Sequence, residues 1–82
     1  MNNILEGAIN QGISLMRDPH LSEQKFNIWL EYSKNLLNLA TKNYALISNY
    51  NTLIATATIG HQQPYQKLSM CLQYLIRSQS HI

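Results

Sequence analysis

The chain has 82 residues, of which 45% are hydrophobic and 12% are charged. This length allows one domain with one modest core, and the hydrophobic share argues against a disordered chain. The charged share is about half of that in an average soluble domain. A surface with so few charges is weakly repelled by its neighbours, which favours self-association, although an AT-rich genome would produce the same residue usage.

The charges are divided unevenly along the sequence. All four acidic residues lie within the first 31 positions, and every charged residue after them is basic. The single cysteine, Cys71, cannot form a disulfide within the chain, which fits a reducing compartment. No apolar run approaches the ~20 residues of a membrane span, and the amino terminus lacks the basic and apolar regions of a secretory signal. We therefore expect a single helical domain over residues 1–82, located in the cytoplasm.

The first predicted helix covers Asn3–Arg17. Its apolar residues recur three and four positions apart, so they share one face. Gly12 lies near the centre of this face, where a missing side chain would let another helix approach closely; otherwise it weakens the helix by roughly 1 kcal/mol relative to alanine. Asp18, Pro19 and His20 should end the helix, because proline disfavours helical geometry at the residue before it.

The longest predicted helix covers Ser22–Thr58, with Ser22 as its N-cap and Glu23 in its first turn. It carries two apolar seams, whereas an ordinary surface helix carries one. The first seam consists of Phe26, Leu30, Ser33, Leu37, Ala40, Tyr44, Ile47, Asn51, Ile54 and Ala55. The second seam consists of Trp29, Tyr32, Leu36, Leu39, Asn43, Leu46, Tyr50, Leu53 and Ala57.

A helix with two apolar seams requires neighbours on two sides. Either it is the middle of a small bundle, or one seam packs within the protomer and the other meets a second chain. Asn43 lies midway along the second seam, where a buried amide fixes the register between helices; the other interpretation is a partly exposed residue at the rim. Weak helix formers near 49–51 would allow a kink or a break there, giving four helices. We predict a single helix because both seams continue in phase.

The last predicted helix covers Pro64–Ser78, with a proline in its first turn. Gly60 should end the preceding helix, and His61–Gln63 should form the connecting loop. The apolar residues of this last helix share one face, except for Met70 and Tyr74. These two side chains would either lie exposed or contact a neighbouring molecule.

The sequence contains no recognisable catalytic or metal-binding motif. His20, His61 and His81 have no ligand spacing, and Cys71 lies on an apolar face where it acts as a small hydrophobic residue. Three residues separate Arg77 from His81, fewer than in the arginine–histidine motif of the HEPN group of helical nucleases. A nuclease is therefore the least favoured alternative, and we expect no enzymatic activity, cofactor or metal ion.

Together these observations predict an all-α fold: a small three-helix up-down bundle with a long central helix, completed by oligomerisation. The predicted function is a non-catalytic protein–protein interaction module, such as an adaptor, an oligomerisation element or a small inhibitor, that binds itself or another protein by helix–helix packing. Short chains of this composition are common on phages and mobile elements, and this association favours a phage-like or mobile-element-like protein. The predicted partner-binding residues are Trp29, Tyr32, Leu39, Asn43, Leu46, Tyr50, Met70 and Tyr74.

The alternative function is a small nucleic-acid-binding regulator that uses the basic residues of the acid-free region. Those residues are Lys34, Lys42, Lys67 and Arg77. They are sparse for a groove that must neutralise several phosphates together. A membrane-binding helix is not expected, because no predicted helix is rich in lysine and arginine.

Overall fold

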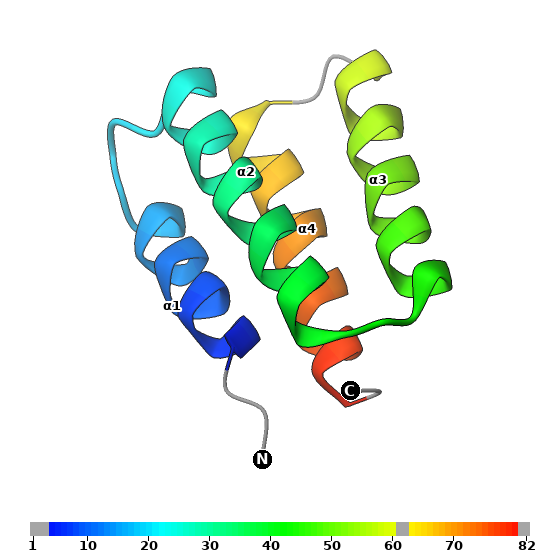
Figure 1. Ribbon diagram of the computed structural model, residues 1–82. Helices are drawn as coiled ribbons and strands as arrows, with labels where there is room; N and C mark the ends of the chain where they lie inside the picture. Colours follow the sequence, from blue (N-terminus) through cyan, green and yellow to red (C-terminus); the bar gives the residue numbers. More distant parts are fainter. Residues whose placement is uncertain (1–3, 61–62, 81–82) are drawn as a thin grey trace.

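The computed structural model describes residues 4–60 and 63–80, and within these ranges it is helical with no strand. The described chain forms four helices: α1 (Ile4–Met16), α2 (Glu23–Ala40), α3 (Tyr44–Ile59) and α4 (Pro64–Gln79). Successive helices run in opposite directions, with α2 in front of α4 and with α1 and α3 at the sides (Figure 1). The fold is therefore an all-α up-down bundle, with one helix more than the sequence predicts over this part of the chain.

The difference lies at residues 41–43, where the predicted long helix ends and the chain reverses. Thr41 is extended, with φ −144° and ψ 151°, and its N–H donates to the carbonyl of Leu37. The Asn43 side chain accepts a hydrogen bond from the N–H of Ala45 at 3.0 Å, and the Asn43 N–H donates to the Thr41 hydroxyl at 3.0 Å. Threonine and asparagine side chains can satisfy backbone groups outside a helix, so they favour helix ends. The prediction of one continuous central helix is wrong for this reason.

The region near 49–51, where a kink was the alternative, is helical and lies inside α3. The Thr52 hydroxyl donates to the carbonyl of Ser48 at 3.0 Å, and the Thr56 hydroxyl donates to the carbonyl of Thr52 at 2.9 Å. These threonines therefore bond to the preceding turn of their own helix instead of interrupting it.

The predicted helix starts at Ser22 and Pro64 are confirmed, whereas the predicted start at Asn3 lies outside the described residues. Ser22 is extended and its hydroxyl accepts a hydrogen bond from the N–H of Lys25 at 3.3 Å, which makes it the N-cap of α2. Pro64 is the first residue of α4, and the Gln66 side chain in its first turn accepts a hydrogen bond from the N–H of Gln63 at 3.2 Å. The termini of these helices therefore depend on side chains that are close in sequence.

The core lies where α1 packs against both α2 and α4, and α3 packs mainly against α4. Gly12 lies at the meeting point of three helices, because a Cβ placed on it would be 2.5 Å from Cδ2 of Leu72 and 3.0 Å from Cζ2 of Trp29. The expected close approach at this glycine is confirmed. The buried hydrophobic residues are Leu5, Ala8, Ile9, Phe26, Trp29, Leu30, Leu37, Tyr50, Ala57, Leu68, Cys71, Leu72 and Leu75.

Tyr50 connects α3 to the rest of the core through its ring and its hydroxyl. The side chain is only 1% exposed, and its ring stacks on that of Tyr74 with centroids 5.4 Å apart. Its hydroxyl oxygen lies 2.7 Å from the Ser33 hydroxyl, which itself donates to the carbonyl of Leu30. A serine hydroxyl has a single hydrogen, so the Tyr50 O–H donates to Ser33. This buried pair is a polar link between α2 and α3.

Replacing Gly12 by alanine should lower the free energy of unfolding by about 1–2 kcal/mol, because overpacking against Leu72 and Trp29 outweighs the gain in helix propensity. Gly7→Ala is the matched control in the same helix. Its Cβ would lie 3.2 Å from the Tyr32 hydroxyl oxygen, the end of a partly exposed side chain that can move aside. Chemical denaturation followed by circular dichroism should therefore show equal or greater stability for Gly7→Ala. A Gly12→Ala chain as stable as the wild type would contradict this packing.

The Ser33–Tyr50 pair should show coupling in a double-mutant cycle. Ser33→Ala leaves the Tyr50 hydroxyl buried without this acceptor, which should cost roughly 1–3 kcal/mol, whereas Tyr50→Phe should cost about 1 kcal/mol. The double variant should be more stable than the sum of the single losses implies, because no phenol remains to be satisfied. Urea denaturation of the four chains gives the coupling energy, and strictly additive losses would show that the two hydroxyls act independently.

Candidate functional site

An apolar surface with a groove lies along α1 and α2. A groove of about 480 Å³ runs between these helices. On α2, the large side chains at positions 28, 32, 36 and 39 point to one side, because their spacings of three and four residues keep them on one helical face. We call this row the outer α2 face. The residues that line the groove are Gln11, Leu15, Lys25, Ile28, Trp29 and Tyr32.

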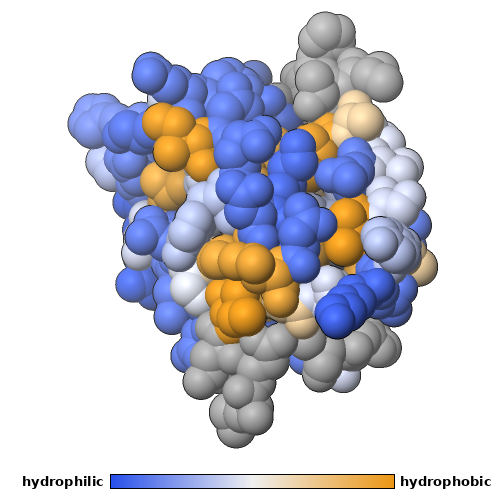
Figure 2. All heavy atoms as spheres, in the orientation of Figure 1, coloured by the Kyte–Doolittle hydropathy of each residue, from blue (hydrophilic) through white to orange (hydrophobic). Residues whose placement is uncertain are grey.

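The outer α2 face is open to solvent. Ile28 is 66% exposed, Tyr32 is 42% exposed and Leu39 is 73% exposed, while Leu36 is partly buried against the core. Figure 2 shows that, on the side presented by α1 and α2, apolar patches lie among polar side chains. Isolated apolar side chains are normal on protein surfaces, but a row beside a groove is typical of a docking surface.

One wall of the groove is held rigidly by the core. Trp29 lies on the inner side of α2, and its indole N–H donates to the carbonyl of Ala8 at 2.8 Å. The indole packs near the ring of Phe26, with centroids 6.2 Å apart, and beside Gly12. The groove therefore exists in the free protein, because the side chain that divides it from the core is fixed by a buried hydrogen bond.

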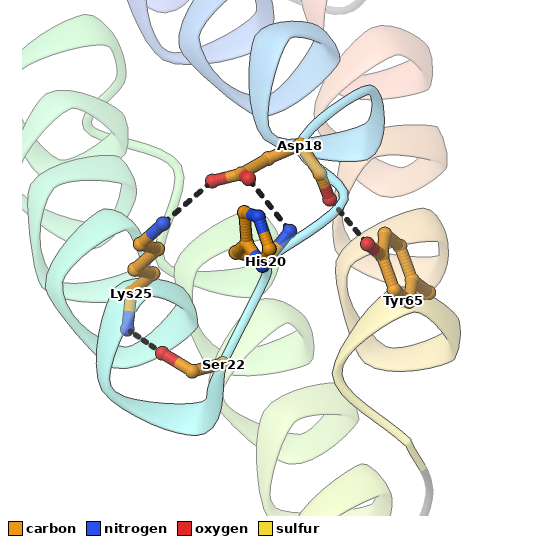
Figure 3. A network of polar contacts seen from close by, with 5 residues as sticks. All are labelled: Asp18, His20, Ser22, Lys25 and Tyr65. Atoms are coloured by element: carbon orange, nitrogen blue, oxygen red, sulfur yellow. Dashed lines mark hydrogen bonds and ion pairs between the residues drawn. The ribbon is translucent and has the colours of Figure 1, made fainter.

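Lys25 lies at the rim of the groove and is held by a polar network at the α1–α2 turn (Figure 3). Its ammonium contacts the Asp18 carboxylate at 2.8 Å, and the same carboxylate accepts the backbone N–H of His20 at 2.8 Å. The Lys25 hydrogen bond, followed by that from His20, lowers the pKa of the Asp18 carboxyl. The hydroxyl of Tyr65 in α4 donates to the Asp18 carbonyl, so this turn is also attached to α4.

The eight predicted partner-binding residues do not form one surface. Trp29 and Tyr50 are buried, Leu46 is partly buried, and Tyr32 and Leu39 are exposed on the outer α2 face. Whether any of them binds a partner stays a prediction. The two aromatic residues in the core are already engaged within the protomer, so the exposed pair are the stronger candidates among these five.

The other three predicted residues lie away from the α1–α2 groove. Asn43 is exposed and its side chain caps the start of α3, so it does not lie inside an apolar seam. Tyr74 is partly buried, and its hydroxyl donates to the carbonyl of Leu46 at 2.6 Å. Met70 and Tyr74 instead line a small groove of about 180 Å³ between α3 and α4. The other residues of that groove are Leu53, Gln73 and Arg77.

Sequence reasoning missed several residues of the α1–α2 groove. Ile28 belongs to neither predicted seam, although it lies four residues before Tyr32 and on the same side of the helix. That spacing of four residues was the signal in the sequence that could have placed Ile28 beside Tyr32. Gln11 and Leu15 enter the groove only because α1 packs beside α2, which the pattern of α1 does not reveal.

Two of the four basic residues of the nucleic-acid alternative form ion pairs within the protein. The Lys67 ammonium is paired with the carboxylate of Glu23 and lies 5.0 Å from the centre of the Phe26 ring, where the side chain is almost fully buried. Lys34 pairs with Glu31 on its own helix at 3.5 Å. The alternative stays untested, but two of its four residues are neutralised within the protein.

The basic residues at positions 42 and 77 lie in different elements. Lys42 belongs to the α2–α3 turn, and Arg77 belongs to the last turn of α4.

The described residues bring no titratable cluster together that would suggest catalysis. Among them, no group of three or more histidine, cysteine or acidic side chains could hold a metal ion. His61 and His81 lie outside the described residues, so the Arg77–His81 spacing has no structural outcome. Burial raises the pKa of the Cys71 thiol to about 11, so it is not an activated nucleophile at neutral pH.

Comparison with known proteins gives no assignment: no family model, curated protein or solved structure matches this chain. Within the described residues, no helix has the length and apolar character needed to cross a bilayer. The α1–α2 groove and the outer α2 face are therefore the features from which a function has to be inferred.

Raising the pH above about 9 should lower the free energy of unfolding, because burial raises the pKa of Cys71 from 9.0 to about 11. The folded state holds this proton more tightly, so the stabilisation is complete below the unfolded pKa and is lost as the pH rises through the folded pKa. Burial also raises the pKa of Tyr50, which acts in the same direction. Cys71→Ala should therefore flatten the decline between about pH 9 and pH 11 in urea titrations. An unchanged slope would show that the thiol does not contribute.

Proposed function

We propose that the protein is a non-catalytic protein–protein interaction module whose docking surface is the α1–α2 groove together with the outer α2 face. The observation that carries the proposal is the exposure of Ile28 and Leu39, at 66% and 73%. Ile28 also lines the groove, so the exposed row and the groove form one continuous surface. Such a surface leaves apolar area in water that a partner would bury.

The shape of this surface suits a helix of the partner protein. Two antiparallel helices form a groove along which a third helix packs with its apolar side inward. Tyr32, which is exposed beside the groove, is a residue type that contributes strongly to binding when a partner surrounds it. Because Trp29 is already fixed by its hydrogen bond to Ala8, binding requires little ordering of this wall, which favours affinity.

The partner is a second copy of the chain or another protein, and the module would act as an adaptor, an oligomerisation element or a small inhibitor. Lys25 is the charged residue at the groove, and it is held by Asp18 at the rim. The docking surface is therefore mainly apolar with a polar edge, an arrangement that protein interfaces share.

Ile28→Glu should weaken partner binding by more than about 2 kcal/mol, because a carboxylate at the centre of an apolar contact must be desolvated. The fold should be unaffected, since Ile28 is mostly exposed. Ile76→Glu is the matched control: the same substitution on α4, at a side chain that is 48% exposed and is not among those lining the α1–α2 groove.

Light scattering over a concentration series measures self-association. Affinity capture with the immobilised wild type, Ile28→Glu and Ile76→Glu chains measures binding to other proteins. The wild type and Ile76→Glu should behave alike, and Ile28→Glu should lose the complex while keeping its helicity. The proposal is wrong if the wild type neither self-associates nor retains a protein that Ile28→Glu releases.

A further inference from the structure

The bundle consists of two helical hairpins, α1–α2 and α3–α4, connected by the turn at residues 41–43. Thr41 is half-buried, and Lys42 and Asn43 are exposed. The side-chain hydrogen bonds that shape this turn are local, because Asn43 bonds to Thr41 and to Ala45. The turn can therefore change conformation without removing one of its own side chains from the core.

The contacts that hold the two hairpins together are made by residues of the helices and of the α1–α2 turn, and not by the turn at residues 41–43. They would form equally well between two copies of the chain, because only the connection through the turn makes them intramolecular. These contacts include those of Gly12 with Leu72, Asp18 with Tyr65, Glu23 with Lys67, and Ser33 with Tyr50.

The sequence on the two sides of the turn is in phase for one straight helix. Tyr32, Leu39 and Leu46 recur every seven residues across it, so in a continuous helix they would form a single stripe. In the closed chain this stripe is interrupted, and Leu39, close to the turn, is 73% exposed. A straightened helix would restore the stripe and provide an apolar contact beside the turn.

We propose that the chain forms a domain-swapped dimer with a second copy of itself, in which α2 and α3 join into one long helix. The α3–α4 hairpin of each copy then packs on the α1–α2 hairpin of the other. The closed monomer and the swapped dimer contain the same core. They differ in the conformation of residues 41–43 and in the contact between the two joined α2–α3 helices, which only the dimer has. The balance is set by protein concentration and by how strongly residues 41–43 favour the turn. The inference does not rest on the proposed function, because the exchange takes place at the turn and not at the α1–α2 groove. Each lobe of the dimer retains its groove.

Two changes at the turn should shift this balance in opposite directions. Tyr44 is the first residue of α3 and is 84% exposed. A proline is tolerated at the first position of a helix but not inside a continuous one, so Tyr44→Pro should abolish the swapped dimer. Combining Thr41→Ala with Asn43→Ala removes the side-chain hydrogen bonds of the turn and should raise the dimer fraction several-fold. Light scattering after unfolding and refolding at high protein concentration measures both effects.

A charge-exchange experiment distinguishes a swapped dimer from any other dimer. Glu23→Lys and Lys67→Glu each place like charges at the contact between the hairpins, which destabilises the closed monomer. In a swapped heterodimer of the two variants, both lobes regain an opposite-charge pair. Their mixture, refolded together, should form a heterodimer that melts at a higher temperature than either variant alone.

The control uses Glu31→Lys and Lys34→Glu, because this ion pair lies within α2 and swapping cannot restore it. Mixing the control variants should therefore produce no gain. The proposal is overturned if the Glu23→Lys and Lys67→Glu mixture stays monomeric, or if Tyr44→Pro dimerises as readily as the wild type. A dimer that is lost with Ile28→Glu but kept with Tyr44→Pro would be assembled through the groove and would likewise overturn the swap.

Discussion

A phenol hydroxyl can be buried only where a hydrogen-bond partner is provided, and this constraint at Tyr50 holds the third helix in the bundle. The ring of Tyr50 stacks on Tyr74, and its hydroxyl bonds to Ser33, so one side chain contacts both α4 and α2. Much of the rest of α3 is polar or small, and α3 packs mainly on α4. A buried polar contact therefore helps to fix the position of α3 relative to α2, beside the apolar residues of α3 that pack against the core.

The packing of α2 in the core explains the candidate docking surface. On α2, the inner side is occupied by residues such as Trp29, whose N–H is bonded to Ala8, and by Ser33, which meets Tyr50. On the other side, α1 and the core cover Tyr32 and Leu36 only in part, and Ile28 and Leu39 are left mostly exposed. The apolar sector of α2 is thus wider than the monomer uses, which is the physical basis of the proposed interaction.

Features that depend on neighbouring residues in the sequence were predictable. The start of α4 at Pro64 and the close helix approach at Gly12 follow from the geometry of proline and the missing side chain of glycine. The turn at 41–43 was not, because the apolar pattern stays in phase across it and helices also contain threonine and asparagine. The candidate site was predictable only in part: the pattern placed Trp29 and Tyr32 on one seam, and only the packing of the other helices shows that the first is buried and the second exposed.

The peripheral position of α3 has a consequence for how the molecule opens. Of the four described helices, α1, α2 and α4 meet around Gly12, while α3 packs mainly on α4 and touches α2 less extensively. Detaching α3 breaks the Ser33–Tyr50 bond and the packing of α3 on Tyr74 of α4, but it leaves the three-helix junction intact. The partial unfolding that costs the least free energy should therefore release α3 first. The opening that exposes the backbone amides of α3 to hydrogen exchange should then cost less free energy than the opening that exposes those of α1.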